Sequence, residues 1–121
     1  MMFTRDMNDG HTKFVFGSNE AGRHGAGAAF EAKTHWDAVY GVGFGPTGDS
    51  FAIPTMDWEI YQLPLPVIRT YVERFLAYAR LHYMTRFLVT PIGTGLCGYT
   101  AEDIKPMFAG APNNCVLPEG W

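Results

Sequence analysis

Hydrophobic positions in this chain fall into short runs that are typical of buried β-strands. Such runs lie at residues 14–16, 50–55 and 87–90. Residues 36–44 predict a further strand, interrupted by glycines, and a turn is expected at 45–49. The pattern therefore predicts a sheet of short strands that are joined by glycine-rich connections.

Helical patterns occur between these strands. Residues 26–33 are rich in alanine, whose small side chain lets a helix pack closely on a sheet. Ile68, Val72 and Phe75 recur at helical spacing and predict the longest helix. A short helix is expected over residues 102–108. Because strands and helices alternate, we expect an α/β fold with a layered sheet.

The length of 121 residues fits one domain spanning residues 1–121, in which residues 1–13 form either a loose arm or an edge strand. No apolar run approaches the roughly 20 residues that span a bilayer, so we expect no membrane partner. The N-terminal stretch is polar and has no apolar signal region, which makes the cytosol the expected location.

Charge and cysteine content narrow the range of partners. The formal net charge is -3 and the pI is about 5.7, so we expect no duplex nucleic acid as a partner. Cys97 and Cys115 have neither the spacing of metal ligands nor the density of a disulfide scaffold. We therefore expect reduced thiols, with no metal and no cofactor. A small anion remains a suitable ligand, because it needs only a local positive field.

Eleven of the fourteen glycines fall in clusters at residues 17–27, 41–48 and 93–98, and two of these clusters directly follow apolar runs. Without a Cβ atom, consecutive backbone N–H groups can turn toward an anion and approach it closely. A helix that follows would add its N-terminal dipole. Neither a dinucleotide fingerprint nor a Walker loop is present in its required context. The clusters predict a nucleotide phosphate site, and the alternative is that they only make tight turns.

The first glycine loop carries polar side chains as well. Asn19 can hydrogen-bond a ribose or a base, while Arg23 and His24 would place positive charge near a phosphate. Thr55 stands at the end of a neighbouring predicted strand. The candidate ligand-binding residues here are Gly17, Ser18, Asn19, Arg23, His24, Gly25, Gly27 and Thr55.

The second glycine loop offers a run of backbone donors that can wrap a diphosphate. Tyr99 at its end either stacks on a ribose or an adenine, or packs against the sheet. The candidate ligand-binding residues in this loop are Ile92, Gly93, Thr94, Gly95, Leu96, Cys97, Gly98 and Tyr99.

Three side chains are candidates for acid or base chemistry: Asp103, Asp57 and His24. Asp57 follows a predicted strand and acts either as a base or as a support for its loop. Asp103 stands three residues after Thr100, which is the spacing of a capping box, so it is either a helix cap or a catalytic group.

Residues 58–66 are rich in proline and aromatic residues. We expect this segment to form either a dimer contact or a lid over the ligand.

Together these motifs resemble a phage and prophage group of small macrodomain-like proteins, over about residues 14–121. The likeness lies in three blocks, at residues 16–29, 52–55 and 92–99, and in the terminal sequence at 117–121. This resemblance implies a three-layer α/β fold with a mixed central sheet flanked by helices. It also implies that the two glycine loops bind ADP-ribose, with the second loop holding the diphosphate.

Among macrodomains, the second loop looks most like that of the terminal ADP-ribose glycohydrolase branch. In that branch a lysine near the Ala-Ile-Pro-Thr block and an aspartate after the second loop do the chemistry, and Asp103 resembles that aspartate. The phage group commonly has lysine where this chain has Met56. A thioether cannot form the covalent adduct of a lysine, so this departure favours binding without turnover.

We therefore expect a protein that binds ADP-ribose or a related nucleotide, cyclic forms included. If a phage encodes it, the bacterial host cytosol is its location, and it would sequester a host defence signal. Two alternatives stay open: an ADP-ribosyl glycohydrolase or ADP-ribose phosphate hydrolase, and a structural or interaction module that binds no nucleotide. The oligomeric state also stays open.

Overall fold

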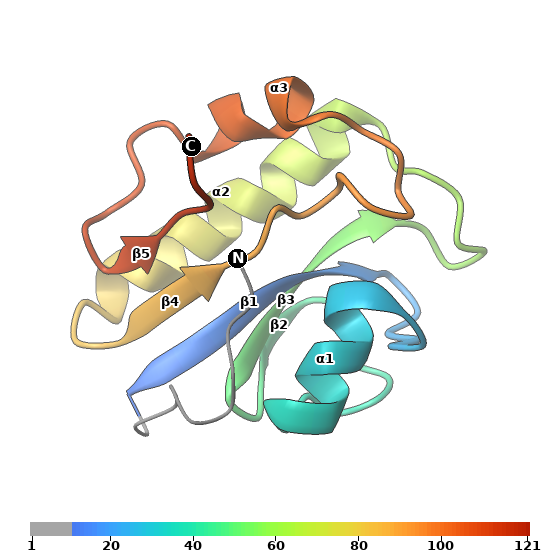
Figure 1. Cartoon of the computed structure of the whole chain (residues 1–121), viewed down its shortest axis with the longest axis horizontal. Coiled ribbons are helices and arrows are strands. Elements are labelled where there is room, and N and C mark those ends of the chain that lie inside the picture. Colours follow the sequence, from blue (N-terminus) through green and yellow to red (C-terminus); the bar gives the residue numbers. More distant parts are fainter. Residues whose placement is uncertain (1–10) are drawn as a thin grey trace.

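The computed structural model describes residues 11–121 and is built on a five-stranded mixed sheet with the order β2-β3-β1-β4-β5 (Figure 1). β1 pairs in parallel with both β3 and β4, and β4 pairs in parallel with β5. β2 is antiparallel to β3. The strands are β1 (Thr12–Asn19), β2 (Gly45–Thr47), β3 (Ser50–Met56), β4 (Arg86–Val89) and β5 (Cys115–Val116).

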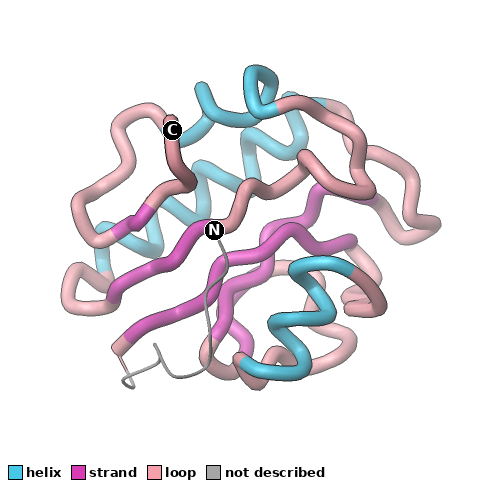
Figure 2. The backbone as a smooth tube through the Cα atoms, in the orientation of Figure 1, coloured by secondary structure: helices cyan, strands magenta, loops and turns pink. Residues whose placement is uncertain are grey.

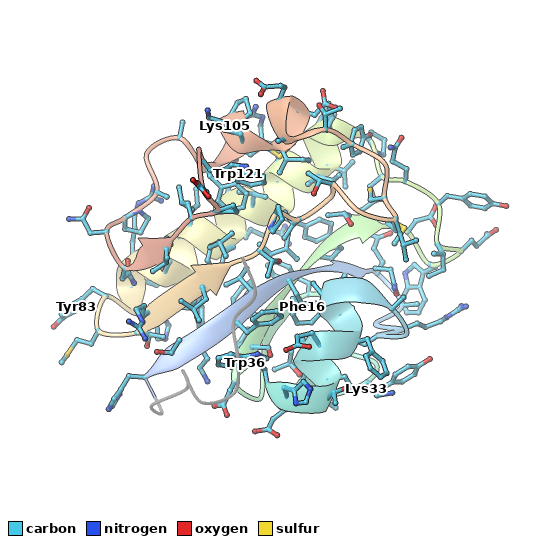
Figure 3. All side chains as sticks on the ribbon, in the orientation of Figure 1. Phe16, Lys33, Trp36, Tyr83, Lys105 and Trp121 are labelled. Atoms are coloured by element: carbon cyan, nitrogen blue, oxygen red, sulfur yellow. The ribbon has the colours of Figure 1, made fainter. Side chains whose placement is uncertain are left out.

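Helices cover both faces of this sheet, which gives three layers and confirms the predicted α/β class (Figure 1). One face carries α1 (Gly27–His35), and the other carries α2 (Leu65–Leu81), α3 (Ala101–Ile104) and the 3₁₀ turn η2 (Lys105–Phe108). Side chains alternate along β1: Phe14 and Phe16 pack toward α1, while Val15 packs toward α2. In the layer under α1, Trp36 stacks on Phe14 with ring centroids 5.3 Å apart, close to Phe16 (Figure 3).

The longest helix, α2, forms as the spacing of its apolar residues predicts. A proline lies in its first turn, where no backbone N–H is needed. Ile68, Val72 and Phe75 are fully buried, and the ring of Phe75 lies 5.0 Å from that of Phe51 in β3. Burying each such side chain stabilises the fold by about 1.5–3 kcal/mol. Among residues 11–121, no helix has the length and apolar character that crossing a bilayer requires.

Two predictions about the sheet are wrong. Residues 11–13 are neither a loose arm nor an edge strand, because Thr12 pairs with Arg86 and β1 is the central strand. Residues 1–10 lie outside the described part of the chain. Residues 36–44 form no strand, and part of the turn expected at 45–49 is the short strand β2.

Residues 40–43 form a loop that packs on the first glycine loop instead of joining the sheet. The Gly41 amide donates to the Gly22 carbonyl at 2.8 Å. A Cβ atom at Gly22 would stand 2.3 Å from the carbonyl carbon of Gly41, and one at Gly43 would stand 2.5 Å from the Asn19 carbonyl oxygen. Gly41 and Gly43 were predicted to interrupt a strand, but they lie in this loop. Gly22 and Gly43 permit the two backbone segments to touch.

We expect Gly22→Ala to destabilise the protein more than Gly110→Ala does. Both glycines have positive φ, +70° and +80°, which costs an alanine about 1–2 kcal/mol. Only Gly22 also has backbone in the way, whereas the Cβ position of Gly110 is open. The overpacking should add about 1–3 kcal/mol to the loss at Gly22. Urea unfolding of both variants measures the difference, and equal losses would contradict the close packing of the two loops.

Candidate functional site

A cavity of about 450 Å³ opens at the carboxyl ends of β1, β3 and β4. Loops gather at this edge of the sheet (Figure 2). Its size lies within the range of about 300–1,000 Å³ that is common for ligand pockets. The carboxyl ends of adjacent parallel strands are where open α/β sheets hold ligands. The cavity is lined by Gly17, Ser18, Asn19, Arg23, Gly25, Ala26, Gly27, Ala28, Ala29, Tyr40, Thr55, Met56, Ile60, Thr90, Pro91, Ile92, Gly93, Thr94, Gly95, Leu96 and Cys97.

The side chain of Asn19 shapes the first glycine loop. Its Nδ2 donates to the carbonyl of Arg23 and its Oδ1 accepts from the amide of Arg23, both at 2.9 Å. The amide of Glu20 donates to the carbonyl of Met56, which ties the loop to the end of β3. The side chain of Asn19 thus closes a turn. Its amide group was expected to hydrogen-bond a ribose or a base, but it is engaged with the backbone of Arg23.

The first glycine loop leads directly into the amino end of α1, which faces the cavity. The N-cap residue is Ala26, which supplies no side-chain cap. The first amide to bond within the helix is that of Phe30, so the amides of Gly27, Ala28 and Ala29 precede the hydrogen-bond ladder. These uncapped amides and the helix dipole make a positive end beside the cavity.

The second glycine loop presents further backbone donors from the other side. Within the loop, Tyr99 donates to Gly93 and Gly98 donates to Gly95, at 2.9 and 3.0 Å. Thr94 makes a longer bond of 3.4 Å to Pro91. Four further amides, all of residues that line the cavity, meet no acceptor within residues 11–121: those of Gly93, Gly95, Leu96 and Cys97.

The second glycine loop passes beside the end of β1. A Cβ atom at Gly17 would lie 3.5 Å from the amide nitrogen of Gly93, so the second loop passes directly beside the strand. Cβ atoms at Gly25, Gly27 and Gly95 would meet nothing within 4 Å. The glycines thus leave open space beside unbonded amides, which is an arrangement that suits an anion.

Arg23 is the charged side chain among the cavity residues, and no Asp, Glu, His or Lys of the described chain lines the cavity. Its Nη2 donates to the carbonyl of Trp58 at 3.2 Å. Positive potential at the site therefore comes from this guanidinium and from backbone dipoles.

His24 does not supply the positive charge that the sequence suggested. Its ring is fully buried, outside the cavity lining, and lies edge-on to Phe16 at 5.2 Å between centroids. Nε2 lies 3.0 Å from the Val42 carbonyl, to which it can donate, while Nδ1 has no hydrogen-bond partner among residues 11–121. Burial lowers the pKa of His24 below its ordinary value, so the imidazole is neutral near pH 7. The ring of His24 thus contacts the loop of residues 40–43, at the Val42 carbonyl and at the ring of Tyr40.

Asp57 and Asp103 also lie outside the cavity lining, and each organises backbone. The Oδ1 of Asp57 accepts from the amides of Glu59 and Tyr61, at 2.9 and 3.0 Å. Asp103 completes a capping box with Thr100, which confirms the helix-cap alternative. The three acid–base candidates are thus dispersed, and none of them faces the cavity.

Two candidates from the second loop lie behind it. Tyr99 packs against the core under α2, and its hydroxyl donates to the Leu63 carbonyl at 2.7 Å. Of the alternatives for Tyr99, packing on the fold is the one observed. Gly98 has φ +89° and makes the turn that precedes it. His24, Gly98 and Tyr99 are the predicted ligand-binding residues that do not line the cavity.

The segment of residues 57–62 crosses from β3 toward both glycine loops. Arg23 holds it at Trp58, and the Nε2 of Gln62 donates to the Cys97 carbonyl at 2.8 Å. Ile60 lines the cavity. Of the residues 58–66 that were predicted to form a dimer contact or a ligand lid, those from Trp58 to Gln62 lie beside the cavity.

Several residues that line the cavity were not predicted from the sequence. Proximity to the end of a predicted strand could have indicated Met56, Thr90 and Pro91. Tyr40 and Ile60 come from loops with no recognisable motif. The missed residues are Ala26, Ala28, Ala29, Tyr40, Met56, Ile60, Thr90 and Pro91.

Cys97 and Cys115 are free cysteines. Cys97 is buried, and its thiol donates to the Thr55 carbonyl at 3.2 Å. Burial raises the pKa of Cys97, and it raises that of Cys115 to about 11, so both thiols stay protonated near neutral pH. Across residues 11–121, no cluster of three or more His, Cys, Asp or Glu side chains could hold a metal ion.

Comparisons with protein-family models, with curated proteins and with solved structures found no match for this chain. The fold and the cavity define a three-layer α/β protein with a backbone-lined pocket at the carboxyl edge of its sheet.

The buried imidazole of His24 makes a pH-dependent contribution to stability. The unfolded chain protonates this ring near pH 6.5, whereas the folded chain protonates it only at lower pH. The unfolded state therefore binds more protons just below pH 6.5, and the free energy of unfolding falls as the pH drops through that window. Urea unfolding at about pH 7.5 and about pH 5 measures this loss. The His24→Gln variant keeps a hydrogen-bond donor that does not titrate, so its free energy of unfolding should fall less between these two pH values. An equal fall in the two proteins would contradict a buried, neutral His24.

Proposed function

We propose that the protein binds ADP-ribose or a related nucleotide, cyclic forms included, with the diphosphate on the amides of the two glycine loops. The observation that carries this proposal is that two sets of residues with unbonded amides line one cavity. The first set stands at the uncapped start of α1, and the second comprises Gly93, Gly95, Leu96 and Cys97. Backbone donors of this kind, supported by a helix dipole, favour phosphate groups.

The chemistry of the cavity wall favours holding the ligand over cleaving it. Met56 lines the cavity at the position where the resembling phage proteins commonly have lysine. Its thioether is not a nucleophile for a sugar carbon in the way that a lysine amine is. The nearby thiol of Cys97 has a raised pKa and is already hydrogen-bonded. A protein of this kind would lower the concentration of a free nucleotide by mass action, as sequestration of a host defence signal requires.

Calorimetric titration with ADP-ribose and with cyclic ADP-ribose isomers, followed by chromatography of the recovered ligand, tests the proposal. We expect heat of binding with at least one of them and recovery of the ligand intact. Recovery of an altered ligand would make the protein an enzyme. The absence of heat with all of these nucleotides would instead favour a structural module.

We expect Gly95→Val to weaken ADP-ribose binding by about tenfold or more, because the new side chain would fill the space beside the second set of amides. The backbone at Gly95 does not have positive φ and nothing lies within 4 Å of its Cβ position, so valine fits without displacing protein atoms. Calorimetry gives the affinity, and thermal unfolding reports whether the fold is kept.

Ala109→Val serves as the matched control, because Ala109 is exposed and lies outside the cavity. This control should bind as the unsubstituted protein does. Normal binding by a folded Gly95→Val protein would place the diphosphate elsewhere.

A further inference from the structure

Three exposed apolar side chains stand at the cavity, each on a different loop. Tyr40 is 58% exposed, Ile60 39% and Leu96 79%, and all three line the cavity. Tyr40 follows α1, Ile60 belongs to the segment after β3, and Leu96 belongs to the second glycine loop. Exposed apolar surface that borders a pocket marks a place where a ligand can bury it.

The polar side chains of the cavity wall are mostly engaged with the protein backbone. Asn19 binds both backbone groups of Arg23. A set of hydroxyl and thiol groups likewise donates to backbone carbonyls: Ser18 to Asn19, Thr55 to Ser18, Thr90 to Val15, Thr94 to Pro91 and Cys97 to Thr55. No carboxylate of the described chain lines the cavity. Few side-chain groups are therefore left to read the hydrogen-bonding edge of a base.

The position of Ile60 is fixed by its surroundings. Its φ is +67°, a conformation that is strained for a β-branched residue and persists only where neighbouring contacts impose it. The carboxylate of Asp57 imposes it by accepting amide bonds from both sides of Ile60. The bonds from Arg23 and Gln62 then hold this segment to the two glycine loops. Asp57 is thus a positioning residue that holds Ile60 at the cavity.

We propose that the site holds the base of its nucleotide by stacking and apolar contact with Tyr40, Ile60 and Leu96, and therefore accepts nucleoside diphosphate riboses whatever their base. This inference rests on the proposed function. Stacking tolerates any base, because every base has a π-face. A site that reads a base by hydrogen bonds can discriminate against an analogue that lacks the bonding group by a factor of about 10⁴–10⁵, whereas apolar contact discriminates far less.

Calorimetric titration with the diphosphoriboses of adenosine, guanosine, cytidine and uridine tests the inference. We expect their affinities to agree to within about tenfold, and ribose 5-diphosphate, which lacks a base, to bind about 5- to 150-fold more weakly. A preference of more than about tenfold for one base would overturn the inference and leave the proposed function standing. The absence of binding by every one of these ligands and by the cyclic ADP-ribose isomers would overturn the proposed function itself.

Substitutions at Tyr40 separate stacking from hydrogen bonding. Tyr40→Ala should weaken all four base-bearing ligands by about 5- to 150-fold and leave the affinity for ribose 5-diphosphate nearly unchanged. Tyr40→Phe keeps the ring and should lose less than Tyr40→Ala does. Equal losses in the two variants would show that the hydroxyl reads the ligand, and would overturn the inference.

Tyr83→Ala is the matched control for the loss of an exposed tyrosine. Tyr83 is 75% exposed in the turn before β4, at the opposite end of the sheet from the cavity (Figure 3). This control should bind all of the ligands normally, and thermal unfolding reports that each variant is folded. A loss of binding in Tyr83→Ala equal to that in Tyr40→Ala would contradict the assignment of the base to the cavity rim.

Discussion

The parallel pairing of β1 with both β3 and β4 determines where the site forms. Three neighbouring strands end at one edge of the sheet, so the loops that follow them must meet there. The second glycine loop passes close to the end of β1, where a Cβ atom at Gly17 would be in ordinary van der Waals contact with Gly93 and Ile92. Residues of that loop and of the amino end of α1 then line the same cavity. The hydrogen-bond donors at the cavity therefore come from the backbone more than from side chains.

Much of the fold could be predicted from local patterns. The spacing of Ile68, Val72 and Phe75 specified α2, and the runs that became β3 and β4 carried strand character on their own. Long-range contacts decided what local patterns could not. The run at residues 36–44 has strand composition, but the contact of Gly41 with Gly22 holds it as a loop. The central place of β1 likewise depends on partners far away in the sequence.

The glycine loops of the site were also predictable, because strand–glycine–helix order implies backbone donors at a strand end. The roles of the side chains at the site were harder to predict. Asn19 and Asp57 have the chemistry to meet a ligand or a substrate, yet each is engaged with nearby backbone amides. His24 is neutral because a loop distant in sequence buries it. Tyr40 and Ile60 became part of the cavity through tertiary packing alone, for which a sequence pattern offers no signal.

The most direct test of the central claim is a ¹H–¹⁵N spectrum of labelled protein during titration with ADP-ribose, because it reports on each amide separately. If the diphosphate is held by the backbone of the two loops, the largest amide proton shifts fall on Gly93, Gly95, Leu96 and Cys97 and on Gly27 at the start of α1. Shifts confined to other regions, such as the turn at Tyr83, or no shifts at all, would contradict this account.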